Sequence, residues 1–332
     1  MYGKNNCPLR SINIELTTEC PLRCPQCYCQ LGQGKSIDFN LARKRIIEAG
    51  ELGVSTVLLS GGETLCYPQL YELIKVAKEN CGNPIASFSG ALFTQEVFEG
   101  LIESGLDEIC ISLNGSSKAI NNQTRDGFDD AITALKVLQK NKFKNTTINW
   151  VMHCSNADDF PNMILIAEQY GVAELSVLGL KPDYRHQLRT LPSSDQLYKM
   201  KKWIRQYQGE LRISVESCYS PLRAVVAETK LFGNMNLGAA RGCSAGLTSY
   251  SINVDGAFSP CRHLEEFEYY PTTKEYLNES KIQRKLRNLE QEPVTGRCVS
   301  CKYQLNCKPC QSINHKIDGV IQNGINYCPI VE

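Results

Sequence analysis

Short apolar runs alternate with amphipathic stretches along the first half of the chain. We expect strands at the apolar runs, which cover 12–16, 56–60, 85–89, 108–113, 147–153 and 174–180. Helical periodicity predicts helices between them, over 40–52, 67–79, 95–104, 128–140 and 160–170. Apolar strands separated by amphipathic helices are typical of βαβ units around a parallel sheet buried on both faces. These α/β units fit an incomplete barrel or an open doubly wound sheet, and periodicity alone does not separate the two.

The pattern changes after residue 180. A further helix is expected over 197–207 and a short strand over 211–216, and glycine and other small residues follow over 233–246. From Cys243 onward the chain is rich in cysteine and weakly periodic, apart from a charged helix-like run over 281–291. Metal is expected to supply much of the stability of such a segment. We therefore predict three segments, a main domain, a bridging segment and a C-terminal domain, over 1–210, 211–242 and 243–332.

Composition and charge narrow the classes of function. Hydrophobic residues make up 42% and charged residues 21% of the 332 residues, as in a globular protein with an apolar core. The formal net charge of +1 gives no indication of a nucleic-acid partner or a membrane-surface partner. No apolar run approaches the roughly 20 residues that cross a bilayer, and the first 20 residues lack the apolar core of a signal peptide. We expect a cytoplasmic protein.

The 17 cysteines are unusual for such a chain. Disulfide frameworks of this density belong to short secreted domains, whereas thiolates that cluster in a reducing compartment are better explained as metal ligands. Cysteines gather between Cys20 and Cys29 and again between Cys298 and Cys328. Metal binding is therefore the leading interpretation.

Cys20, Cys24 and Cys27 follow the first expected strand with C-x3-C-x2-C spacing. Three thiolates on one tight loop can hold three irons of a four-iron, four-sulfur cluster, and the fourth iron then stays open to a small molecule. An open coordination position is typical of a catalytic metal site rather than a structural one. The alternatives are a structural zinc loop or redox cysteines.

This loop resembles the defining motif of the radical S-adenosylmethionine (SAM) superfamily. The resemblance implies a partial (β/α)6 TIM-like barrel and a cluster on Cys20, Cys24 and Cys27 whose open iron binds SAM. The run Gly61-Gly62-Glu63, which closes the second expected strand, is similar to the family's GGE motif, which meets the amino group of SAM. Glycine permits close backbone approach there, and a carboxylate can accept hydrogen bonds from an ammonium.

Further SAM contacts are implied by the same resemblance. Ser89 stands where relatives usually have the asparagine of Thr-Asn-Gly, and Asn114 replaces the aspartate of Ile-Ser-Leu-Asp-Gly. Ser112 and Asn114 become candidates for contacts to the SAM carboxylate or ribose. Arg125 matches a frequent Arg-x-Gly-x-Phe pattern and is a candidate partner for the SAM carboxylate. An exposed arginine near a helix start is the alternative.

The C-terminal third resembles the seven-cysteine SPASM extension of one branch of this superfamily, which usually carries two auxiliary four-iron clusters. The gap between Cys307 and Cys310 is two residues, where the usual pattern has three. By analogy with the family, auxiliary cluster I would be held by Cys243, Cys261 and Cys310. Auxiliary cluster II would be held by Cys298, Cys301, Cys307 and Cys328. Three [4Fe-4S] clusters are then expected in all, with a pair of zinc knuckles as the alternative for this region.

Auxiliary cluster I lacks a fourth cysteine in this pattern. Its open iron is expected to bind a substrate thiolate, or else to take Cys218 or His263 as a distant ligand. Cys218 is also a candidate hydrogen-atom donor or a packing residue. Of the other cysteines, Cys29 and Cys66 lie next to the expected SAM site, where function and simple packing are the alternatives. Cys110 and Cys154, in or beside expected strands, are expected to pack, and Cys7 and Cys81 lie outside both motifs.

The resemblance implies an oxidoreductase that reductively cleaves SAM to a 5′-deoxyadenosyl radical, which abstracts a hydrogen atom. The first-choice substrate is a ribosomally synthesised precursor peptide that is matured by a thioether, carbon–carbon or related link. The first strand near residue 12 leaves no room for a leader-recognition domain, so a separate leader-peptide-binding protein is an expected partner, beside an electron donor such as flavodoxin or ferredoxin. The alternatives are a sulfatase-maturase-like or small-molecule dehydrogenase, or a non-catalytic iron–sulfur or zinc protein.

Overall fold

The computed structural model describes most of the chain, namely residues 9–29, 31–182, 185–217, 220–227, 235–236, 243–304, 307–328 and 330. Two compact units form, and each is assembled from separate stretches of sequence. The first unit comprises 1–112, 129–146 and 245–287, and the second comprises 113–128, 147–244 and 288–332. Among the helices of the described residues, none combines the length and the apolar character that a membrane span requires.

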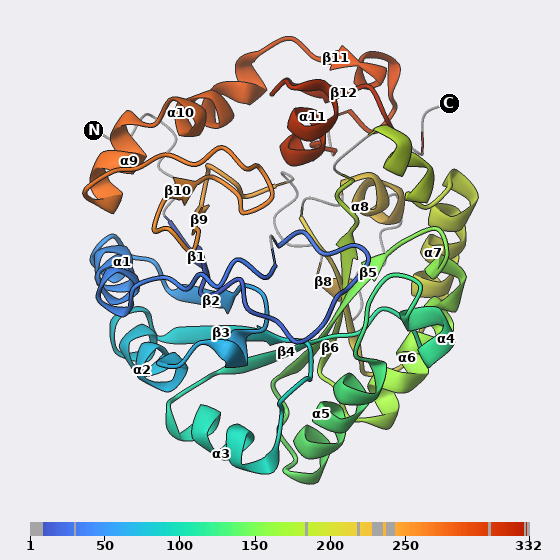
Figure 1. The fold of residues 1–332 in the computed structure, drawn as a ribbon. Coiled ribbons are helices and arrows are strands. Elements are labelled where there is room, and N and C mark those ends of the chain that lie inside the picture. The colour runs from blue at the N-terminus through green and yellow to red at the C-terminus, as the bar shows by residue number, and fades with distance from the viewer. Residues whose placement is uncertain are drawn as a thin grey trace. The chain divides into compact units, whose positions relative to one another are not determined.

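The first unit is built on four parallel strands in sequence order, β1 (Ser11–Glu15), β2 (Thr56–Ser60), β3 (Asn83–Phe88) and β4 (Glu108–Ser112). The connections run through α1 (Phe39–Glu51), α2 (Leu70–Cys81) and α3 (Gln95–Glu103), and α5 (Phe128–Lys140) follows. Figure 1 shows α1, α2 and α3 along one side of these strands. The α/β fold with a parallel sheet predicted from the sequence is confirmed.

Alternation along β1 explains how this sheet presents polar groups. Ile12 and Ile14 are fully buried, whereas Asn13 and Glu15 point to the opposite face and are partly exposed. Successive side chains of a strand face opposite sides, so the apolar side packs under the helices and the polar side is left for a site. Asn13 on that polar side donates to the Ser60 hydroxyl at 3.1 Å, at the end of β2.

Residues 245–287 add to the same unit from far along the chain. They supply β9 (Ser249–Ile252), which pairs in parallel with β1, and β10 (Phe258–Ser259), which pairs antiparallel with β9. They also form α9 (Thr273–Glu279) and α10 (Lys281–Asn288). Tyr250, Phe258 and Tyr276 are buried against one another, with the rings of Phe258 and Tyr276 stacked at 4.7 Å. Apolar packing therefore stabilises this stretch, which its weak periodicity does not indicate.

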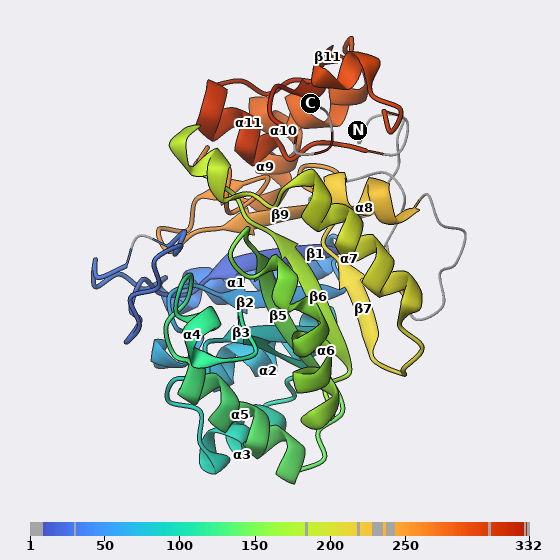
Figure 2. The ribbon, with the colours of Figure 1, turned by 90° about the vertical axis from the view of Figure 1, so that its right-hand side faces the viewer.

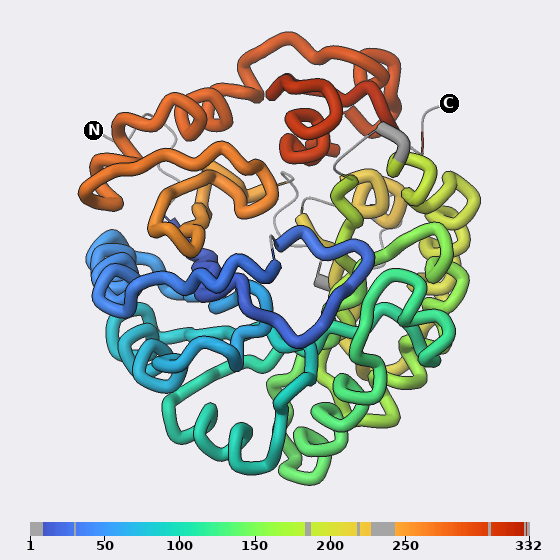
Figure 3. Tube along the Cα trace, in the orientation of Figure 1, coloured from blue at the N-terminus to red at the C-terminus, as the bar shows by residue number. Residues whose placement is uncertain are grey.

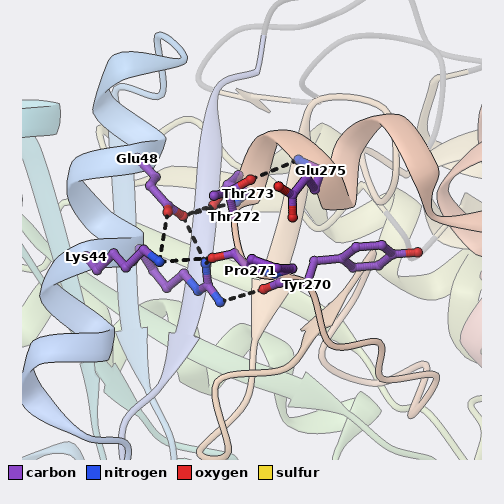
Figure 4. Close-up of polar contacts among 8 residues, drawn as sticks. Lys44, Glu48, Tyr270, Pro271, Thr272, Thr273 and Glu275 are labelled. Atoms are coloured by element: carbon purple, nitrogen blue, oxygen red, sulfur yellow. Dashed lines mark hydrogen bonds and ion pairs between the residues drawn. The ribbon is translucent and has the colours of Figure 1, made fainter.

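Polar contacts fasten this added segment to α1, as Figure 4 shows. Arg45 donates to the carbonyl of Pro271 at 3.0 Å and pairs with Glu48 at 3.0 Å, and its guanidinium lies 4.4 Å from the ring centroid of Phe258. Glu48 in turn accepts from the backbone and the hydroxyl of Thr273 at 3.0 and 2.8 Å. Arg45 is almost fully buried, and a buried charge is tolerated when it is paired and hydrogen-bonded, as it is here.

The second unit contains β5 (Thr146–Met152), β6 (Glu174–Gly179), β7 (Arg212–Val215) and β8 (Met235–Asn236), all in parallel. Its helices are α4 (Lys118–Asn121), α6 (Phe160–Gln169), α7 (Ser194–Gln206), α8 (Ser220–Ala227) and α11 (Gln311–Asp318). Figure 2 shows α6 and α7 beside β6 and β7. A small parallel pair, β11 (Thr295–Gly296) with β12 (Gly324–Ile325), organises its C-terminal part.

Candidate functional site

The cysteine loop is a long excursion between β1 and α1, traced in blue in Figure 3. Its base is closed by an antiparallel bridge between Thr17 and Ser36. Within it, Cys20 and Cys24 are half-buried and Cys27 is exposed, and the backbone N–H of Cys27 donates to the carbonyl of Cys24 at 3.1 Å. This tight turn keeps the second and third cysteines on one short stretch of backbone.

The chemistry of these donors fits a metal cluster. Burial raises the pKa of Cys20 to about 11, and the charges of Cys24 and Cys27 are among the further causes, so the three sulfurs interact. With this pKa the Cys20 thiol is protonated at neutral pH, and it releases its proton when metal binds. No group of three His, Cys, Asp or Glu side chains within the described ranges is placed to hold a single metal ion. A four-iron cluster takes one thiolate per iron, so three cysteines on one loop can each hold one iron.

The Gly61-Gly62-Glu63 turn at the end of β2 is bound to the start of the cysteine loop through backbone atoms. Gly62 donates to the carbonyl of Thr17 and Glu63 donates to the carbonyl of Glu19, both at 2.7 Å. Gly61 has a φ of 144°, and a Cβ on Gly62 would lie 2.3 Å from the carbonyl oxygen of Glu19. The two glycines are therefore required because the loop backbone passes directly against them.

The Glu63 carboxylate is fully buried and held by protein donors. Its Oε2 accepts from the Ser89 backbone at 2.9 Å and also from the Ser89 hydroxyl, and its Oε1 accepts from the Leu65 backbone at 3.2 Å. These donors, from Leu65 and Ser89, fix the position of the Glu63 side chain. The predicted direct contact between Ser89 and SAM stays a prediction, while the structure shows that the Ser89 hydroxyl binds Glu63.

Asn114, just beyond β4, lies in the second unit and is almost fully buried. Its amide nitrogen donates to the Thr124 hydroxyl at 3.1 Å and its amide oxygen accepts from the Val151 backbone at 3.0 Å. Its carbonyl accepts from the Trp150 indole at 3.1 Å. Both ends of the amide are thus used inside the protein, and Asn114 organises the turn after β4.

The remaining predicted SAM contacts lie on either side of that turn. Ser112 is the last residue of β4 in the first unit, and Arg125 lies in the second. Asn121 donates to the Arg125 carbonyl at 2.8 Å, which fixes the backbone there. The Arg125 Nε is buried and has no hydrogen-bond partner within the described part of the chain. A guanidinium placed in this way is available to a carboxylate ligand.

Glu15 and Arg262, near the cysteine loop, were not singled out by sequence reasoning. Burial raises the pKa of Glu15, at the end of β1, to about 7, with Arg262 opposing and Cys27 adding to the rise. Cys29 donates its thiol to the carbonyl of Gly61 at 3.0 Å, which adds a side-chain link to the two backbone bonds between the loop and the glycine turn. The available signal for Glu15 was its position on the polar face of β1, two residues after Asn13.

In the second unit, the β11–β12 pair brings cysteines from two distant stretches together. Cys298 follows β11 and Cys328 follows β12. Burial raises the pKa of Cys307 to about 12, and Cys328, Cys298 and Cys301 add to that rise. The structure thus places near one another the four cysteines that the resemblance assigns to auxiliary cluster II. Cys301 and Cys307 also pack against a small buried cluster that includes Tyr303.

The cysteines assigned to auxiliary cluster I fall in different units. Cys310 is buried at the N-terminus of α11 and Cys243 is half-buried, both in the second unit, whereas Cys261 lies in the first unit after β10. His263, the alternative ligand, also lies in the first unit, with its ring 4.5 Å from that of Tyr28. Cys218 falls outside the described residues.

The cysteine loop and the glycine turn lie within a range of the chain that matches a known protein family. Residues 14–167, from β1 to α6, match the family model of the radical SAM superfamily. Residues 14–167 form a radical SAM domain. The matched range includes the cysteine loop and the Gly61-Gly62-Glu63 turn.

Proteins similar to this chain are named for different activities. AdoMet-dependent heme synthase of Methanosarcina barkeri is 23% identical over 99% of this chain and 98% of its own length. PqqA peptide cyclase of Ruegeria pomeroyi is 28% identical over 86% of this chain and 78% of its own length. The crystal structure of Streptococcus suis SuiB bound to S-adenosylmethionine has a TM-score of 0.77 at 16% identity, covering 97% of this chain and 77% of SuiB. At that identity the likeness shows the fold.

The cysteine group of the second unit leads to a first prediction. A variant with Cys298→Ala, Cys301→Ala and Cys307→Ala should lose about four irons per chain, one cluster's worth, because the single remaining thiolate of this group cannot hold a four-iron cluster. Iron and sulfide analysis of the anaerobically reconstituted protein measures this. Cys154→Ala, in the same unit and outside the group, is the control and should keep the full iron content. Equal iron in the two variants would contradict the assignment.

Proposed function

We propose that this radical SAM enzyme binds a [4Fe-4S] cluster on Cys20, Cys24 and Cys27 and SAM beside it, and that it abstracts a hydrogen atom from a peptide substrate. The observation that carries the proposal is the backbone connection between the cysteine loop and the Gly61-Gly62-Glu63 turn, at 2.7 Å in two places. These bonds hold the loop that carries the cluster ligands at a fixed position relative to the turn, which is suited to an ammonium group.

The chain's own residues have distinct roles in this proposal. The cluster, when bound, supplies one electron that cleaves SAM to methionine and a 5′-deoxyadenosyl radical. The turn at Gly61 and Gly62 offers backbone groups to the SAM ammonium, and Glu63 keeps that turn in place through its bonds to Ser89. Arg125 pairs with the SAM carboxylate through a guanidinium whose Nε has no hydrogen bond within the described residues. Such positioning is the protein's contribution, since the cofactor carries the difficult chemistry.

The C-terminal cysteines add electron-transfer sites in this proposal. Cys298, Cys301, Cys307 and Cys328 hold auxiliary cluster II, and Cys243, Cys261 and Cys310 hold auxiliary cluster I, as in the SPASM extension. They accept or relay the electron that the substrate radical loses. A flavodoxin or ferredoxin serves as the electron donor, and a separate protein presents the leader of the precursor peptide.

The peptide substrate is supported by two relatives. PqqA peptide cyclase is named for a peptide that it cyclises, and SuiB has also been solved bound to its precursor peptide SuiA, with a TM-score of 0.75 to this chain. A small-molecule substrate is the second candidate, because the heme synthase matches nearly the whole chain.

Deuterium transfer separates the two candidates. The reconstituted enzyme is incubated with SAM, reductant and short peptides encoded beside its gene, each carrying deuterium on its side-chain carbons. A peptide substrate should yield 5′-deoxyadenosine that is heavier by one deuterium, together with a peptide of altered mass. Radical formation that alters only an added heme precursor, with every peptide unchanged, would overturn the peptide proposal and favour the second candidate.

A further inference from the structure

Arg262 lies where three elements of the proposed SAM site meet. Its guanidinium carbon is 5.0 Å from the ring centroid of Tyr28, the residue that follows Cys27 in the cysteine loop. Its Nη1 donates to the Ser60 hydroxyl at 3.5 Å, at the end of β2 and directly before Gly61. All of these residues belong to the first unit, so the arrangement is internal to one compact body.

Neighbouring side chains fix the orientation of this arginine. The Arg262 Nε donates to the His263 Nε2 at 3.3 Å. The His263 ring meets the Tyr28 ring edge-on, with centroids 4.5 Å apart. Arg262 and His263, which are adjacent in sequence, thus both contact the aromatic ring of the residue that directly follows the C-x3-C-x2-C motif. A cation over an aromatic face is an attractive contact that restrains both partners.

Arg262 also carries a positive charge close to acidic and thiol side chains. It is the main influence that opposes the raised pKa of Glu15, while Cys27 and Glu265 add to that rise. Its charge therefore acts on the end of β1 and on the loop that carries the cluster ligands. Nearby charges and hydrogen bonds set the reduction potential of an iron–sulfur cluster, and a fixed cation favours the reduced, more negative state.

We propose that Arg262 is a positioning residue that holds the cysteine loop through Tyr28 and raises the reduction potential of the cluster bound by Cys20, Cys24 and Cys27. This inference rests on the proposed function. Because Arg262 directly follows Cys261, it also links the segment of the proposed auxiliary cluster I to the SAM-binding loop. That segment enters the first unit through β9 and β10, which extend the sheet beyond β1.

Redox titration of the full-length, reconstituted enzyme tests the role of Arg262. The signal followed is the electron paramagnetic resonance of the reduced cluster that changes when SAM is added, which distinguishes it from auxiliary clusters. In Arg262→Met, the ratio of reduced to oxidised cluster at a given potential should fall about tenfold, a shift of ~59 mV to more negative potential for a one-electron couple. Arg262→Lys keeps the charge and should restore most of the wild-type potential.

Two further variants keep the outcome interpretable. Arg284→Met removes a charge on α10 of the same unit, where Arg284 contacts the carbonyl of Asn278, and should leave the potential unchanged. Tyr28→Leu removes the aromatic ring but keeps the charge of Arg262. It should disorder the cysteine loop and shift the reduction potential less than Arg262→Met does. This variant tests the contact if the Arg262→Met protein does not bind the cluster. An unchanged potential in Arg262→Met, or equal shifts in the methionine and lysine variants, would overturn the inference. Failure of the wild type to form a SAM-responsive cluster would instead refute the proposed function.

Discussion

A triple variant with Cys20→Ala, Cys24→Ala and Cys27→Ala should lose one cluster and all cleavage of SAM. The three sulfurs lie on one loop and influence each other's charge, and the backbone of that loop is bonded to the glycine turn. Without them the loop keeps only Cys29, and one thiolate cannot hold a four-iron cluster. Loss of about four irons per chain, with no 5′-deoxyadenosine formed in the presence of SAM and reductant, is the expected result.

Cys81→Ala is the matched control for this variant. Cys81 ends α2 in the same unit, and its thiol contacts the carbonyl of Ile46. Burial raises the pKa of Cys81 to about 11, much as it does for Cys20, so the two thiols differ in location more than in acidity. The control should keep its iron and its SAM cleavage. Persistent SAM cleavage in the triple variant would show that another set of cysteines holds the catalytic cluster.

Gly62→Ala should disrupt the SAM site although it removes no functional group. The new Cβ would lie 2.3 Å from the carbonyl oxygen and 2.8 Å from the carbonyl carbon of Glu19, and these are backbone atoms that cannot move aside alone. Overpacking of this kind costs about 1–3 kcal/mol. Displacement of the loop from the turn should weaken SAM binding by about tenfold or more, which corresponds to ~1.4 kcal/mol. Equilibrium binding of SAM to the reconstituted enzyme measures it.

Gly171→Ala separates this local effect from general destabilisation. Gly171, after α6, has a φ of 66°, and an added Cβ there meets nothing within 4 Å. Alanine is therefore strained in the backbone but does not collide, and should lower the melting temperature while leaving the SAM affinity unchanged. If Gly62→Ala binds SAM as the wild type does, the close approach at Glu19 has no role in forming the site.

The local hydrophobic pattern was sufficient to predict most strands of the parallel sheet. The strand predicted over 56–60 and the helix predicted over 128–140 have the limits that the structure shows for β2 and α5. Val57 and Leu59 are fully buried, and the buried positions of α5 recur at helical spacing, at Ala131, Ala134, Leu135 and Leu138. Period-two and period-3.6 patterns survive folding here because one side of each element faces the core.

Long-range pairing was beyond the reach of that reasoning. The hydrophobic pattern predicts no strands at β9 and β10, although β9 pairs with β1. Gly256, in the turn between β9 and β10, has a φ of 77°. Such short strands carry little periodic signal, and only the Asp255-Gly256 turn was available as a cue. The bond from Ser89 to Glu63 and the position of Arg262 over Tyr28 likewise depend on neighbours that only the folded chain provides.

The formation of 5′-deoxyadenosine by the anaerobically reconstituted wild-type protein tests the central claim most directly. With SAM and a strong reductant, and with iron and sulfide measured in the same preparation, the account predicts 5′-deoxyadenosine and methionine in equal amounts. It also predicts that the product disappears when Cys20, Cys24 and Cys27 are replaced. A preparation with intact iron–sulfur clusters that forms no 5′-deoxyadenosine, or a colourless one that holds stoichiometric zinc, would contradict it.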